Sequence, residues 1–259
     1  MNAITIHVES NDPAVKAHRK ETAGRVSKYI EQNFSVPTHL RALCYLADED
    51  VNWLKEMWGG HANRGVHWPI RGQGLHDWPQ DMWETIAPID PQLGVTWPYD
   101  SVIYLHGSTC ETDIGLTMTL AHELQHFLQY ANERQLWAAN TLLMKLPSLP
   151  TDDLKAWSDL PVEREARIIA KQVAESLHGT APVDQHIQSM IDAGTSDADV
   201  ADWKFIRAID PSIRYDLREE TKPFVRRHKQ ELIQLQQETG FKEDKDFSAV
   251  DFNSGEWDV

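Results

Sequence analysis

From residue 119 to residue 128 the chain reads Thr119-Leu120-Ala121-His122-Glu123-Leu124-Gln125-His126-Phe127-Leu128. The stretch holds the pattern H-E-x-x-H inside an apolar run. On a helix, residues four apart lie on one face, so His122 and His126 can direct their imidazole rings at a single metal ion. Glu123 lies one position round, where it can hold a metal-bound water but is poorly placed as a third ligand. The pattern is typical of zinc hydrolases, in which the carboxylate acts as general base.

Chance is the first alternative, because the chain holds 12 histidines in 259 residues. Random placement at this composition produces the pattern in roughly a few per cent of chains, so the motif alone is moderately specific. The apolar neighbours indicate a buried helix, where two histidines and a glutamate need polar partners. A metal ion supplies such partners. Two satisfied core histidines beside a surface glutamate remain the alternative at this point.

Composition limits the classes of protein and partner. The formal net charge of −15 argues against nucleic acid or an anionic membrane surface as the main partner, and it is compatible with a protein or peptide substrate. The only cysteines, Cys44 and Cys110, predict neither a disulfide framework nor a thiolate metal site. We see no signal peptide and no apolar run long enough to span a bilayer, so we expect a cytoplasmic protein. The oligomeric state is not predicted.

The pattern along the chain predicts an α+β fold that is predominantly helical. Strands are expected at 4–8, at 101–106 and, less clearly against a helix, at 40–46. We expect helices at 13–34, at 112–146 with a bend, at 151–157 and at 161–177, then short helical pieces over 181–210 and one or two charged helices over 211–240. The Trp-rich segment 51–98 is expected to be irregular, and its histidines (His61, His67 and His76) to be ordinary polar residues.

Three regions follow from these elements. We expect an upper lobe over 1–110, a helical lobe carrying the metal site over 111–240, and an acidic tail over 241–259 that is mobile or loosely docked. The strand at 101–106 precedes the motif helix, so it can lie at a sheet edge beside the metal and pair with an extended peptide. An internal strand with no substrate role is the alternative.

A catalytic zinc site needs a third protein ligand. A third histidine at the end of H-E-x-x-H-x-x-G-x-x-H is excluded, because Gln129 stands at the glycine position and Asn132 at the histidine position. The next long helix offers Glu163 and Glu165. Glu163 lies on the apolar stripe of that helix, whereas Glu165 lies nearer its flank, so periodicity favours Glu163 as the ligand.

Other acids stay open as the third ligand. They are Glu165, Asp159 and Asp184. A further alternative makes Glu163 a partly solvated acid in a first helical turn, where the helix dipole favours it.

Over residues 101–177 the chain resembles the gluzincin group of zincin metallopeptidases, because His122-Glu123-x-x-His126 is followed by Glu163-x-x-Ala166. The compact Glu-x-Glu-Ala form is similar to minimal ImmA/IrrE-type cytoplasmic or phage-associated peptidases. The resemblance implies a small mixed sheet over the motif helix, with His122, His126 and Glu163 as zinc ligands and Glu123 as base. Arg167 departs from it, since such families often place there an Asp or Asn that orients a histidine ligand.

We therefore expect a zinc metallopeptidase with one Zn²⁺ per chain, in which Glu123 takes a proton from the zinc-bound water as it attacks a peptide carbonyl. Two alternatives are a catalytically silent zincin-fold module with a regulatory or protein-binding role, and a helical interaction module whose motif is accidental. The side chain that stabilises the transition state is not decided by the sequence. The candidates are Tyr130, His106, His178 and His186.

Overall fold

The computed structural model describes residues 3–48, 64–69, 99–149, 154–194, 197–238 and 250–257. Over these ranges the chain is α+β and mostly helical, with a four-stranded mixed sheet and eight α-helices, which confirms the predicted fold class. In the same ranges no helix is both long enough and apolar enough to cross a membrane. The division into two lobes and a tail stays a prediction.

The sheet has the strand order β1-β2-β4-β3. Strands β1 (Ile4–Val8), β2 (Ala42–Leu46) and β4 (Ser101–Leu105) are parallel, whereas β3 (Gly65–Pro69) pairs antiparallel with β4. The three strands predicted near 4–8, 40–46 and 101–106 are thus confirmed. The expectation that 101–106 forms an edge is wrong, because β4 lies between β2 and β3.

Strand β3 corrects the expectation that 51–98 is irregular throughout. Its five residues begin with Gly65 and end with Pro69, so turn-type residues leave three positions on which a strand pattern could be recognised. The other tryptophans of that segment and its remaining histidines lie outside the described residues. They are Trp53, Trp58, Trp78, Trp83, Trp97, His61 and His76.

Three helices build the core against the sheet. Helix α1 (Pro13–Asn33) follows the N-cap Asp12, whose carboxylate accepts hydrogen bonds from the Ala14 and Val15 amides. Helix α4 (Asp113–Asn132) holds the H-E-x-x-H motif and is capped by Thr112. Helix α7 (Pro161–His178) starts with proline and stops before Gly179, whose φ of +87° suits glycine.

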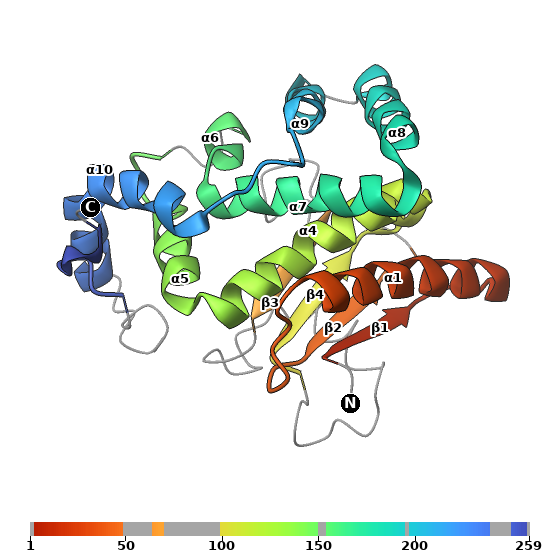
Figure 1. Cartoon of the computed structure of the whole chain (residues 1–259), viewed down its shortest axis with the longest axis horizontal. Coiled ribbons are helices and arrows are strands. Elements are labelled where there is room, and N and C mark those ends of the chain that lie inside the picture. The colour runs from red at the N-terminus through yellow and green to blue at the C-terminus, as the bar shows by residue number, and fades with distance from the viewer. Residues whose placement is uncertain are drawn as a thin grey trace.

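The sheet packs one face against these helices. Side chains at alternate positions of β2 and β4, such as Cys44, Leu46 and Ile103, share a buried cluster with Leu120 and Leu124 of α4. Val173 of α7 belongs to the same cluster. Figure 1 shows the resulting layers, with α4 between the sheet and α7. The motif helix is therefore buried on several sides.

The predicted helix over 112–146 is two helices. Helix α4 ends at Asn132, and α5 (Arg134–Leu143) begins after Glu133, whose φ of −130° and ψ of 55° interrupt the helical path. A short 3-10 turn, η3 (Gly107–Cys110), connects β4 to α4. The bend expected in this region is confirmed as a break at one residue.

The remaining helices pack around α7 and α5. They are α6 (Leu154–Ser158), α8 (Thr180–Ala193), α9 (Asp197–Ala208) and α10 (Leu217–Glu238). Helices α8 and α9 lie beyond α7 on the side away from the sheet, while α5 and α10 lie at one end (Figure 1). Helices α8 and α9 are longer than the short pieces expected over 181–210.

The end of the acidic tail is docked, which corrects the expectation of a mobile or loosely docked segment for residues 250–257. Val250, Phe252 and Trp257 are buried in a cluster with side chains of α5 and α10. The Trp257 indole donates a hydrogen bond to the Asp251 carbonyl, and the 3-10 turn η4 (Gly255–Trp257) ends there. The many acidic residues of this tail indicate an exposed segment, so the sequence alone does not show that these three apolar side chains are buried.

Candidate metal centre

Helices α4 and α7 bring His122, His126 and Glu163 to one point. The Nε2 atoms of His122 and His126 lie 3.1 Å apart. Glu163 places Oε2 3.5 Å from His122 Nε2 and Oε1 3.3 Å from His126 Nε2. The donor atoms of the three residues all lie within 4.8 Å of one another, and in the described ranges no other group of histidine, cysteine or acidic side chains converges in this way. The three side chains can hold a metal ion.

The electrostatics of this group favour a cation. The Glu163 side chain is 5% exposed, and burial alone would raise its pKa, but the neighbouring His126 and His122 outweigh burial and hold the pKa well below its usual range. Burial lowers the pKa of His122 to about 4, so its ring is neutral near pH 7. Burial also acts to lower the pKa of His126, but the Glu163 carboxylate outweighs it and raises this pKa to about 9. A buried anion thus faces a position that favours positive charge.

Gln129 orients His126 from one helical turn further along α4. Its amide Nε2 donates to the Val162 carbonyl at 3.0 Å and to Glu165 Oε2 at 2.9 Å. Both neighbours are acceptors, so Gln129 Oε1 must face His126 Nδ1, at 2.8 Å. Nδ1 of His126 therefore carries a proton, and Nε2 is the atom that can bind a metal.

The Gln129 contact explains how Glu165 is used. Glu165 accepts hydrogen bonds from Gln125 and Gln129 and belongs to the support of His126, whereas Glu163 faces the two histidines. In the sequence, Gln129 stands out only as the residue at the glycine position of the longer zinc motif, so its role in orienting His126 was not predicted. Its separation of three residues from His126 on one helix was a usable signal.

Arg167 also has a different role from the acid that the resemblance implies. Its NH1 donates to Glu163 Oε2 at 2.8 Å, one turn further along α7. Arg167 therefore contacts the Glu163 carboxylate, while Gln129 orients the His126 ring.

Glu123 lies beside the group and against the edge strand. It is 5% exposed, and burial raises its pKa to about 7, although the positive charge at His126 opposes the rise. The backbone of His67 in β3 also hydrogen-bonds the carboxylate. A Cβ placed on Gly65 would lie 3.1 Å from Glu123 Cγ, so the absence of a side chain there permits the close approach of β3 to α4. A carboxyl group with a pKa near 7 can both accept and return a proton at neutral pH.

His67 was expected to be an ordinary polar residue, yet it lies in the strand nearest to Glu123. Its ring packs against Phe127 and Tyr130 of α4, and its Nε2 lies 3.1 Å from Ser101 Oγ. Burial lowers its pKa well below the ordinary value. The side chain fixes β3 on α4, and the backbone reaches Glu123.

The four candidates for transition-state stabilisation differ in their surroundings. His178 is fifteen residues after Glu163 on α7, roughly 22 Å along the helix at 1.5 Å per residue, and it pairs with Thr117. His186 packs edge-to-face on Trp203. Tyr130 is fully buried, with its ring against Trp137 and Arg134. The contacts of His178, His186 and Tyr130 are packing and hydrogen-bonding contacts that stabilise the fold.

His106, the fourth candidate, is buried directly after β4, with its ring edge-to-face on Tyr104. Of the fallback ligands, Asp159 and Asp184 do not join the converging group. Asp184 lies on the exposed face of α8, at an open depression of about 770 Å³.

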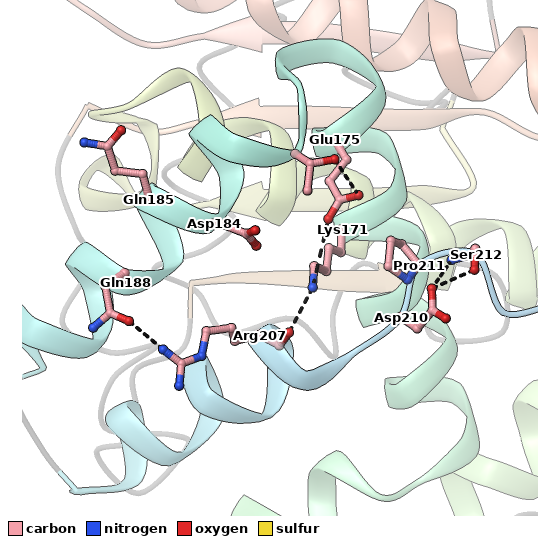
Figure 2. A pocket seen from close by; sticks show the side chains of 10 residues that line it. Lys171, Glu175, Asp184, Gln185, Gln188, Arg207, Asp210, Pro211 and Ser212 are labelled. Carbon is pink, nitrogen blue, oxygen red and sulfur yellow. Dashed lines mark hydrogen bonds and ion pairs between the residues drawn. The ribbon is translucent and has the colours of Figure 1, made fainter.

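That depression is separate from the metal group. Figure 2 shows that two cations lining it have partners: Lys171 donates to the Arg207 backbone carbonyl, and the Arg207 side chain donates to Gln188. None of the three converging residues lines it.

Comparisons with known proteins add no family to this geometry. No protein-family model, no curated protein and no solved structure matches the chain. The chain's own residues provide a His-His-Glu group that can hold a metal ion, with a buried carboxylate of raised pKa beside it.

Proposed function

We propose that the chain is a zinc-dependent metallopeptidase with one Zn²⁺ bound by His122, His126 and Glu163. The spacing of the donor atoms carries this proposal. Tetrahedral zinc with bonds of about 2.0–2.1 Å requires donors separated by about 3.3 Å. The two imidazole Nε2 atoms lie 3.1 Å apart, and each has a Glu163 oxygen nearby, Oε1 at 3.3 Å from His126 and Oε2 at 3.5 Å from His122. Two imidazoles and a carboxylate also form a donor set that catalytic zinc sites use, with the fourth position open.

Glu123 is the general base of the proposed reaction. A zinc ion in this place supplies a Lewis acid that lowers the pKa of water and polarises a carbonyl. Glu123 would take the proton from that water and return it to the leaving amine, and the burial that raises the pKa of its carboxyl in the metal-free chain favours holding the proton between these two transfers. The backbone hydrogen bond from His67 holds the carboxylate in place, and burial keeps bulk water from competing for it.

The edge strand supports a peptide as the substrate. In the described part of the chain, β3 pairs with β4 on one side only, and no strand lies on its other side. An extended peptide can add to such an edge through main-chain hydrogen bonds. Because β3 touches Glu123 at Gly65, a peptide bound along it would pass close to the base. We propose β3, and not β4, as the strand that receives the substrate.

Three variants test the proposal. Glu123→Gln should keep zinc at about one per chain and lose at least 10²-fold in kcat against a mixed library of fluorescence-quenched peptides, because general-base catalysis contributes that much. His122→Ala should lose both zinc and cleavage. The matched control, His178→Ala, removes a histidine of α7 outside the group and should keep both.

The outcomes separate the alternatives. Cleavage by the Glu123→Gln variant at the wild-type rate would overturn the role of Glu123. A wild-type chain that binds zinc and cleaves no member of the library would replace the peptidase with a catalytically silent zinc protein.

A further inference from the structure

A buried chain of alternating charges leads away from the third ligand. Arg167 donates through NH1 to Glu163 and through Nε to Asp202 Oδ1, at 2.8 and 3.3 Å. Arg64 donates through NH1 to the other oxygen of Asp202 and through NH2 to Asp199 Oδ1, both at 3.0 Å. Five side chains from α7, α9 and the residue before β3 are thus linked in series. We call Glu163, Arg167, Asp202 and Arg64 the relay.

Most of the relay is shielded from water, so its ion pairs depend on one another. The side chains of Glu163, Arg167 and Asp202 are 5%, 9% and 10% exposed, and that of Arg64, at the outer end, is 22% exposed. Exposed ion pairs contribute little, but a buried charge that loses its partner is strongly unfavourable, so each member requires the next. Arg64 also stacks on Trp203, with its guanidinium carbon 3.9 Å from the ring centroid. The outer end of the relay is therefore held by packing as well as by charge.

We propose that the relay positions Glu163, the proposed third ligand. The relay also joins Glu163 to the edge strand β3. This proposal rests on the proposed function, since it concerns the same zinc site. Arg167 donates to Oε2 of Glu163 while Oε1 faces His126 Nε2 at 3.3 Å, so Arg167 holds the carboxylate in the orientation that directs it at the two histidines. Arg64 directly precedes Gly65, so the same relay keeps β3 at its distance from Glu123.

Only an arginine can connect this relay. Its guanidinium offers several N–H donors in a rigid fork, and Arg167 uses different nitrogens for Glu163 and for Asp202. A lysine would keep the charge but present one nitrogen. Arg167→Lys therefore separates position from charge, because the local net charge is unchanged.

The test measures metal binding in the full-length chain, so it does not depend on a substrate. Arg167→Lys should weaken zinc binding about tenfold in a chelator competition, within the range for residues that orient metal ligands. The visible spectrum of the Co(II)-loaded variant should also change, because the Glu163 carboxylate is then no longer held in one orientation. Arg64→Met, at the outer end, should weaken zinc binding by a smaller factor.

A double variant and a control guard against a loss of folding. Arg167→Met with Asp202→Leu removes the pair together, and it leaves Glu163 with the two histidines and Arg64 with Asp199, so the fold should be retained while zinc binding still falls about tenfold. Lys171→Met is the matched control. Lys171 is a buried cation one turn further along α7 that holds the Arg207 and Ile209 carbonyls near the end of α9. Its loss should leave the zinc affinity and the Co(II) spectrum unchanged.

Wild-type zinc affinity and Co(II) spectrum in both Arg167 variants would overturn the relay. An equal loss in the Lys171→Met control would also overturn it, because the effect would then come from general packing of α7. If the wild type binds zinc but cleaves no peptide, the peptidase proposal fails alone, and the same binding measurements still decide the relay.

Discussion

Gln129 determines which nitrogen of His126 faces the metal position. Its amide is oriented by two acceptors, the Val162 carbonyl and Glu165, so its oxygen is left for His126 Nδ1. One neutral side chain thereby sets the tautomer of a proposed ligand, the task that the resemblance to gluzincins assigns to an Asp or Asn at position 167. Arg167 itself donates to Glu163 and leaves the orientation of His126 to Gln129.

The residue-scale prediction is that Gln129→Met weakens zinc binding about 10- to 100-fold, because an outer partner of a metal ligand commonly contributes that much. The measurement is a chelator competition on the purified chain. Gln125→Met is the control, since Gln125 donates to the same Glu165 oxygen from one turn earlier, whereas the side chain that hydrogen-bonds His126 Nδ1 is Gln129. Equal losses of zinc affinity in the two variants would show that the effect comes from the lost hydrogen bond to Glu165, and not from the lost contact with His126.

At the scale of elements, the contact between β3 and α4 determines where Glu123 lies. A Cβ at Gly65 would approach Glu123 Cγ, Thr119 Cγ2 and the Tyr104 carbonyl, each at 3.1 Å. One of these atoms is backbone in the neighbouring strand, and Glu123 is buried, so neither yields easily. The strand and the helix are in contact because residue 65 has no side chain.

We expect Gly65→Ala to lower the free energy of unfolding by about 1–3 kcal/mol, as overpacking of a close contact does. It should also reduce peptidase activity by displacing β3 from Glu123. Urea denaturation of zinc-free protein measures the first effect. The control is Gly24→Ala in α1, where nothing lies within 4 Å of an added Cβ. This control should gain about 0.5–1 kcal/mol from helix propensity. A Gly65→Ala variant as stable as the wild type would contradict the close contact.

For the whole molecule, Asp202 connects parts that are far apart in the sequence. It binds Arg167 of α7 and Arg64 before β3 from its place on α9. Burial acts to raise its pKa, but the two guanidinium groups outweigh burial and leave the pKa lowered. Its folded pKa thus lies below the unfolded value of about 3.9, so its contribution to stability is present above about pH 4 and is lost as the pH falls further.

The expected result is that Asp202→Asn lowers the free energy of unfolding by about 3 kcal/mol near pH 7, as the loss of one partner in a buried ion pair does. The difference from the wild type should shrink below about pH 4, because the Asp202 carboxyl of the unfolded wild type binds a proton there while the folded one still resists it. Urea denaturation of the zinc-free proteins from pH 7 to pH 3 measures both values. A difference that stays constant over this range would show that the charge of Asp202 is not what stabilises the fold.

Much of the fold could be predicted from local patterns. The helix over Pro161–His178 has a proline start, a glycine stop and a clear apolar stripe, and all three appear where they were expected. The edge strand β3 could not be predicted, because a strand of five residues with Gly65 at one end and Pro69 at the other has no pattern of its own. Its strand geometry comes from pairing with β4, which is a contact between segments distant in the sequence.

The candidate site divides in the same way. The sequence by itself determined His122, Glu123 and His126 as a group, since four residues make one turn of helix and place the two imidazoles together whatever surrounds them. It also favoured Glu163 over Glu165 by helical period. The distances between Glu163 and the histidines, the contact of Gly65 with Glu123, and the relay through Asp202 were decided only by the tertiary structure. These depend on how α4, α7, α9 and β3 pack, and packing between distant segments leaves no periodic signal in a single sequence.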